Sequence, residues 1–357
     1  MGRTEPPRRP GPIALPLGPA AQDPSTGTPP LFRPVARGAS PHVAIMGGVG
    51  SGKTRTALFM LAELAKQAPV PLVAFDFKGD LTGDATGLDR SFAAEVLDPL
   101  ERPIPLDVLA FDPAKPHARE LAAQRLRDSL AALKGGAFGA VQRGLLGDAA
   151  ARALASHRPC RLEDVRDALV AVYEEHGKAR DGAVETLVDL CRFPLFEPKE
   201  PPADFFGRAR VIRLRQDLPD LVRSVVATLV TDALDRWLNA EPDTPVDPEG
   251  NRALRIVAVI DEAHRILGRK LPGLSNLVRM SRSKGGMIWL ISQSPDDFET
   301  EDDDFLAEMG LVVAFATNAR PGATKRIFGS RVELADLGKG EAFVRIRGEK
   351  ARRLRIW

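Results

Sequence analysis

The stretch AIMGGVGSGKT, at residues 44–54, constrains the fold of this chain more than any other feature. Gly47 and Gly52, followed by Lys53 and Thr54, fill the pattern G-x-x-x-x-G-K-[ST]. The apolar residues before the loop predict a buried strand, and apolar residues at helical spacing over 54–67 predict a helix after it. In this setting the glycines let backbone N–H groups turn inward around a polyphosphate, and the helix N-terminus adds positive charge.

The same loop predicts which side chains meet a bound nucleotide. Lys53 is expected to reach the β- and γ-phosphates, and the Thr54 hydroxyl is expected to ligate Mg²⁺. The predicted nucleotide-binding residues are Gly47, Gly48, Val49, Gly50, Ser51, Gly52, Lys53, Thr54 and Arg55.

Five apolar runs are typical of parallel strands that are covered on both faces. Helical segments separate most of them, which predicts an α/β fold, a RecA-like P-loop core with a mainly parallel sheet. The runs are HVAIM, PLVAFDF, RIVAVID, MIWLIS and LVVAFAT, at residues 42–46, 71–77, 255–261, 287–292 and 311–317. Two alternating runs, at 209–215 and 341–348, predict edge or half-exposed strands.

The predicted domain organisation is one core interrupted by a helical insertion. Residues 1–11 are rich in proline and arginine and are expected to be disordered, and 12–40 are expected to form a lead-in hairpin. The RecA-like ATPase core is assigned to 41–113 and 204–357, on either side of an all-helical insertion at 114–203.

Composition narrows the class of protein. Hydrophobic content of 44% and charged content of 27% are those of an ordinary soluble protein, and a net charge of +2 excludes a uniformly basic surface. Cys160 and Cys191 stand alone, which fits a reducing cytosol and does not favour a zinc site. No apolar stretch approaches the ~20 residues that a bilayer requires, and the N-terminus lacks a signal-peptide core. A cytoplasmic protein without a membrane segment is predicted.

The run RIVAVIDEAH presents two acids, Asp261 and Glu262, at the end of a predicted strand. Asp261 is expected to hold the metal, and Glu262 to orient and deprotonate an attacking water. Two solvated acids at a strand end are the alternative. The letters DEAH also label two-lobed helicases, but residues 262–357 are too few for a second lobe, so that interpretation is rejected.

Gln293, at the end of the run MIWLISQSP, could sense the γ-phosphate or position water, or could be a polar cap on a strand. Arg279 and Arg282 precede this run on a predicted helix, at a spacing that puts both on one face. They are candidates for an arginine finger that reaches into a neighbouring subunit, with ordinary surface arginines as the alternative.

These motifs, taken together, resemble the HerA/FtsK branch of the P-loop ATPases, the hexameric DNA pumps. The resemblance extends over about residues 12–347: PIALPLG, the phosphate loop, FDFKGDL with Asp76 and Lys78, DEAH, RSKGG, ISQSP and the closing segment NARPGATKRIFG…LADLGKGEAFVRI. It implies a homo-oligomer, expected to be a hexameric ring, that binds ATP and Mg²⁺ and acts on double-stranded DNA. It implies Arg282 as the arginine that acts in trans, with Arg279 as second choice and Arg320 and Arg326 open. From this sequence we expect neither the membrane anchor of FtsK nor the N-terminal barrel that docks HerA to its nuclease.

Contact with DNA is predicted in one loop. Arg269 and Lys270 follow the DEAH motif and form our candidate pore loop, with an ordinary exposed turn as the alternative. The basic tail RIRGEKARRLRIW could touch nucleic acid, but a charged edge strand explains it better.

Three functions follow. The leading one is an ATP-driven translocase of double-stranded DNA in a DNA-processing or phage-defence complex, with a nuclease or other effector protein as a partner. The second is a secretion- or conjugation-type ATPase that moves protein or protein–DNA substrates. The third is a nucleotide-switched scaffold for a nuclease.

Overall fold

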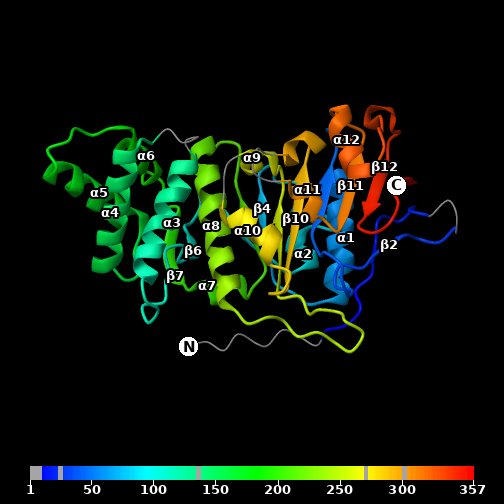
Figure 1. Ribbon diagram of the computed structural model, residues 1–357, viewed down its shortest axis with the longest axis horizontal. Helices are drawn as coiled ribbons and strands as arrows, with labels where there is room; N and C mark the ends of the chain where they lie inside the picture. The colour runs from blue at the N-terminus through cyan, green and yellow to red at the C-terminus, as the bar shows by residue number, and fades with distance from the viewer. Residues whose placement is uncertain (1–9, 23–26, 134–137, 269–271, 300–303) are drawn as a thin grey trace.

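The computed structural model describes residues 10–22, 27–133, 138–268, 272–299 and 304–357 (Figure 1). The predicted disorder at 1–11 therefore falls, except for residues 10 and 11, outside the described residues. Within these ranges no helix is both long enough and apolar enough to cross a bilayer.

A nine-stranded sheet forms the centre of the described chain, in the order β13-β12-β11-β3-β10-β9-β4-β8-β5. The strands from β11 to β5 in this order run parallel. The strand β12 is antiparallel to β11, and β13 is antiparallel to β12. Their bounds are β3 (Val43–Met46), β4 (Leu72–Asp76), β5 (Glu95–Leu97), β8 (Arg210–Arg213), β9 (Ile256–Ile260), β10 (Gly286–Ser292), β11 (Leu311–Phe315), β12 (Glu341–Ile346) and β13 (Arg352–Arg355).

The five fully apolar runs form the middle of this sheet, as β3, β4, β9, β10 and β11. Every residue of these strands is buried, because helices cover both faces. The predicted α/β fold with a mainly parallel sheet is therefore confirmed. The prediction of an edge or half-exposed strand holds for β12, whose residues alternate in burial. It is wrong for β8, which is mostly buried and lies between β4 and the edge strand β5.

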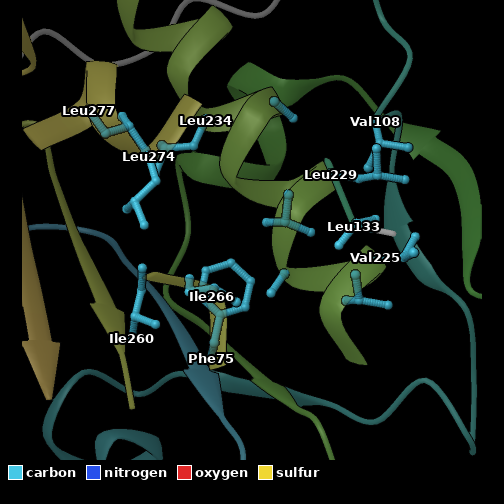
Figure 2. Close-up of a cluster of buried hydrophobic side chains, with 14 of the residues drawn as sticks. Phe75, Val108, Leu133, Val225, Leu229, Leu234, Ile260, Ile266, Leu274 and Leu277 are labelled. Carbon is cyan, nitrogen blue, oxygen red and sulfur yellow. The ribbon is translucent and has the colours of Figure 1, made fainter. Parts of the chain in front are cut away.

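Alternate residues of the central strands supply two hydrophobic layers. Val43 and Ile45 pack on the side of α1 (Lys53–Gln67), α2 (Leu88–Ser91) and the antiparallel pair β1 (Leu15–Pro16) and β2 (Leu31–Phe32). Ala44 and Met46 belong to the other layer, with α8 (Asp220–Ala240), α9 (His264–Leu267) and α10 (Pro272–Met280). Figure 2 shows this second layer, where side chains of β4, β9 and α9 lie close to those of α10 and α8.

The helical segment extends this second layer away from the sheet, at one end of the molecule (Figure 1). It contains α3 (Ala118–Leu133), α4 (Ala140–Ser156), α5 (Leu162–Glu175) and α6 (Gly182–Leu190), and α3 packs on α8. At its end β7 (Phe196–Glu200) pairs in parallel with β6 (Ile104–Leu106), and α7 (Pro202–Phe206) follows. The insertion predicted at 114–203 is therefore not all-helical, because the short apolar start of β7 gave too weak a strand signal. The C-terminal part adds α11 (Phe305–Glu308) and α12 (Pro321–Phe328), with short 3-10 turns at Pro295–Phe298 and Leu334–Asp336.

Candidate nucleotide-binding site

Four neighbouring parallel strands, in the order β3-β10-β9-β4, bring the predicted motifs to one edge of the sheet. The phosphate loop follows β3, Gln293 follows β10, Asp261 and Glu262 follow β9, and Lys78 follows β4. Because parallel strands end at the same edge, segments that are far apart in the sequence meet there, which is where open α/β sheets bind ligands.

The backbone of the phosphate loop is anchored to the strands on both sides of β3. Gly47 N–H donates to Ser292 O at 3.3 Å, and Gly48 N–H donates to Ala316 O at 2.8 Å. A Cβ on Gly47 would lie 2.5 Å from Ser51 Oγ and 2.7 Å from Phe315 Cβ, so no larger residue fits there without a shift. Gly50 and Gly52 have φ of +74° and +109°, in the left-handed region that glycine tolerates best.

The side chains of the loop differ in how they are placed. Lys53, the first residue of α1, is only 6% exposed, and its Nζ has no hydrogen bond or ion pair among the described residues. Val49 is 89% exposed, so its part in phosphate binding would come from its backbone. The Arg55 guanidinium lies 3.6 Å from the ring centroid of Trp357, whose Nε1–H donates to Thr56 Oγ1 at 2.9 Å.

Asp261 is buried without a partner. Its side chain is 1% exposed, and neither carboxylate oxygen has a hydrogen-bond donor within the described ranges. Burial, and after it the charges of Glu262 and Asp76, raise the pKa of the Asp261 carboxyl to about 7. A buried carboxylate normally has compensating donors or a cation, so these oxygens fit a divalent cation.

The type of donor favours Mg²⁺. No group of three or more histidine, cysteine, aspartate or glutamate side chains within the described ranges could enclose a metal ion. Mg²⁺ is usually held by one or two carboxylates together with substrate phosphates. Asp261 and the hydroxyl of Thr54 are suited to that arrangement.

Glu262 is held at both of its carboxylate oxygens. Lys78 Nζ lies 2.5 Å from Oε1, Gln293 Nε2 donates to Oε2 at 2.8 Å, and His264 Nε2 lies 3.6 Å from Oε2. Burial alone would raise the pKa of Glu262, but the hydrogen bonds from Lys78 and Gln293 outweigh it and keep the pKa below its ordinary value. The backbone of Glu262 has φ of +48°, a conformation that costs free energy in a residue with a Cβ.

The contact between Lys78 and Glu262 was not predicted from the sequence. Asp76 fixes the turn that carries Lys78: its Oδ1 accepts from Gly79 N–H at 2.6 Å and from Lys78 N–H at 3.3 Å, and its Oδ2 accepts from Leu81 N–H at 3.3 Å. The available signal was the motif FDFKGDL, in which a lysine directly follows a buried strand.

Comparisons with known proteins agree with this geometry. The family described as "Helicase HerA, central domain" matches residues 34–116. The predicted resemblance to the HerA/FtsK-like P-loop ATPases is confirmed.

Solved structures share the fold over almost the whole chain. VirB4 of Thermoanaerobacter pseudethanolicus superposes with a TM-score of 0.72 at 17% identity, over 96% of each chain. The bacterial conjugative coupling protein TrwB superposes with a TM-score of 0.63 at 14% identity, over 92% of this chain and 86% of TrwB. Other TrwB structures hold the non-hydrolysable ATP analogue ADPNP or ADP with Mg²⁺. No protein with curated annotation matches the chain.

Arg282, which the HerA/FtsK resemblance singles out, lies at the opposite edge of the sheet from the phosphate loop. The helix α10 ends at Met280, so Arg279 is on the helix and Arg282 is on the turn before β10, not on the same helix as predicted. The seven residues of β10 separate Arg282 from the carboxyl edge by roughly 20 Å. Arg282 is exposed beside a cleft of about 340 Å³.

The remaining arginine candidates differ from Arg282 in being paired within the subunit or in lying outside the described residues. Arg320 Nε lies 3.0 Å from Asp296 Oδ1, and Arg326 makes a two-point contact with Glu299 at 2.7 and 3.0 Å. No hydrogen bond or ion pair of the Arg282 guanidinium occurs among the described residues. Arg269 and Lys270, the predicted pore loop, lie outside the described residues.

Proposed function

We propose that this chain is a Mg²⁺-dependent ATPase that assembles into a ring and moves double-stranded DNA. One observation carries the ATPase part of this proposal: a phosphate loop, an unpartnered buried carboxylate and a second, fixed carboxylate lie at one sheet edge. A protein that only binds nucleotide has no need of the second carboxylate. Hydrolysis requires a group that orients and deprotonates water.

The predicted site residues at this edge each have a role in the proposed reaction. The loop amides and Lys53 bind the phosphates, while Asp261 and Thr54 hold Mg²⁺, which when bound neutralises charge on the β- and γ-phosphate oxygens. Glu262 takes the proton of the attacking water. Gln293 follows β10, between the strand of the phosphate loop and the strand of Glu262, so its amide is suited to sense the γ-phosphate while it holds the glutamate.

A ring is proposed because Arg282 cannot serve its own phosphate loop. It lies at the other edge of the sheet, is exposed, and has no partner in the described part of the chain. Head-to-tail contacts between identical subunits bring two different surfaces together and close into a ring. In such a contact Arg282 would reach the nucleotide of its neighbour.

DNA is proposed as the substrate because HerA/FtsK-like chains pump it, and a nuclease or other effector protein of a DNA-processing or phage-defence complex is the proposed partner. With a net charge of +2, a single subunit releases few counterions. Several copies of Arg269 and Lys270 around a pore would contact more phosphates. The fold shared with the conjugative coupling protein TrwB favours, as a second candidate, a conjugation- or secretion-type ATPase.

The test is ATP turnover with and without linear duplex DNA, alongside the mass of the assembly. The Lys53→Ala change is expected to abolish nucleotide-dependent activity, and Glu262→Gln to leave ATP bound but unhydrolysed. Turnover that rises with DNA supports the translocase, while DNA-independent turnover favours the second candidate or a nucleotide-switched scaffold. Normal hydrolysis by Glu262→Gln would refute the assignment of the base.

A further inference from the structure

We propose that Lys78 is a positioning residue for hydrolysis, which holds the Glu262 carboxylate in the place from which it acts on water. The inference rests on the proposed ATPase function. It assigns a role to Lys78 of the FDFKGDL motif. The roles proposed above for the phosphate loop and the two acids do not include this lysine.

The contacts around Glu262 leave it little freedom. The side chain is 1% exposed, and its two oxygens are engaged separately, Oε1 by Lys78 and Oε2 by Gln293. Gln293 is fixed in turn, because its N–H donates to Asp297 Oδ2 at 3.1 Å and its carbonyl accepts from Thr317 Oγ1 at 2.9 Å. The orientation of the carboxylate is therefore set by one cation and one amide.

Lys78 reaches this place because of the strand order. The strand β4 pairs directly with β9, with Phe75 opposite Ile260 in the register, so the turn after β4 lies beside the acids after β9. Asp76 accepts three backbone N–H groups of this turn and so fixes the residue from which the Lys78 side chain starts. Lys78 is 27% exposed, so its ammonium group lies at the margin of the site, whereas the carboxylate that it holds is buried.

The backbone of Glu262 explains why such a restraint is needed. A non-glycine residue in the left-handed region persists only where its surroundings determine its conformation. A buried carboxylate that loses its cation is also strongly disfavoured. Without Lys78, the carboxylate therefore has reason to turn toward another partner or toward solvent, away from the attacking water.

The experiment compares Lys78→Ala, Lys78→Gln and Lys78→Arg with Glu262→Gln and with the control Lys66→Ala. Lys66 is matched because it also pairs with a glutamate, Glu63 at 2.6 Å, but lies on the surface at the end of α1. Steady-state ATP turnover gives kcat and KM, a fluorescent ATP analogue gives the affinity, and thermal melting reports folding.

We expect Lys78→Ala and Lys78→Gln to lower kcat by roughly 10–100-fold, since a misplaced catalytic group costs about that much. Their KM and nucleotide affinity should stay within a few-fold of the wild type, because Lys78 does not belong to the phosphate loop. Lys78→Arg should recover part of kcat, and Lys66→Ala should not change it.

Every other result of these measurements refutes a particular part of the proposal. An unchanged or raised kcat in Lys78→Gln overturns the positioning role, and a raised one would show that Lys78 restrains the base instead. Equal losses of kcat, affinity and melting temperature that arginine does not rescue would show a merely structural role. If Glu262→Gln still hydrolyses ATP, the proposed function fails and not only the role of Lys78.

Discussion

Replacing Arg282 by alanine tests whether the site is completed by a second subunit. Its guanidinium is exposed at the amino edge of the sheet, and no ion pair of it occurs among the described residues. Its removal should therefore change the free energy of unfolding by no more than about 0.5 kcal/mol. A finger supplied in trans is typically worth about 10³–10⁵ in rate, or roughly 4–7 kcal/mol of transition-state stabilisation. A folded, ATP-binding variant with almost no turnover is expected.

The assay mixes this variant with the Lys53→Ala protein. Neither parent can form a working interface, because one lacks the arginine everywhere and the other lacks the phosphate-binding lysine everywhere. In a mixed ring, an intact phosphate loop can meet an intact Arg282 of its neighbour. Phosphate release at fixed total protein should therefore rise as one variant is titrated into the other, with a maximum near equal amounts.

The comparison is Arg326→Ala, because Arg326 is half exposed and already paired with Glu299. An exposed ion pair of this kind is worth about 0–1 kcal/mol, so this variant should turn over ATP almost normally. No recovery at any mixing ratio, despite mixed assemblies confirmed by mass, would move the finger to Arg279, Arg320 or Arg326, or remove the need for one.

Three further predictions follow from single features. Burial lowers the pKa of His42 from 6.5 to about 4; the unfolded chain therefore binds a proton that the folded chain does not, and the contribution of His42 to the unfolding free energy should fall by roughly 2 kcal/mol from pH 7 to pH 5. Asp261, whose pKa is raised to about 7, contributes with the opposite sign over this range, so the comparison is with a variant of His42. In urea titrations the stability of the wild type relative to His42→Asn should fall by that amount between pH 7 and pH 5, and an unchanged difference would refute the role of His42. The Gly47→Ala change should weaken ATP binding more than Gly50→Ala, whose left-handed φ costs about 1–2 kcal/mol but whose Cβ meets no atom within 4 Å; calorimetry that gives equal losses would contradict the packing argument. DNA affinity should fall steeply with salt in the assembled ring, and equally tight binding by a monomeric variant would refute the pore-loop proposal.

Much of the candidate site could be predicted because each part follows a buried strand. The phosphate loop, Asp261, Glu262 and Gln293 all come directly after apolar runs. Parallel strands end at one edge, so the type of sheet already brings these residues together. Apolar runs covered on both faces are also the clearest strand signal in the sequence.

The error at β8 has a physical cause. Arg210 makes its run look half exposed, but the side chain is 1% exposed and lies 2.7 Å from Glu95 and 2.9 Å from Glu200. An arginine that is neutralised by acids of β5 and β7 gives the same alternating pattern as one that faces water. Sequence periodicity cannot separate these two cases unless it is known that another strand, here β5, covers the outer edge of β8.

The contact of Lys78 with Glu262 was missed for a different reason. It depends on β4 being the neighbour of β9, although 184 positions separate the two residues. The local pattern shows only that a lysine follows a strand. Strand order, which local patterns do not encode, decides which acid that lysine meets.

Charge at the carboxyl edge gives an independent reason to favour a ring. Lys78 is paired with Glu262, and Arg55 lies over the ring of Trp357, so two cations near the loop are already engaged within the subunit. Lys53 is the loop cation left to face the phosphates, and charge develops on the γ-phosphate oxygens during hydrolysis. A further cation from a neighbouring subunit would stabilise the charge that develops on the γ-phosphate oxygens. Because the folded neighbour already holds this cation in place, little free energy would be spent on reorganising it during the reaction. An exposed arginine at the opposite edge of an identical chain meets this need, which is why Arg282 and the phosphate loop are best tested together, in two different subunits.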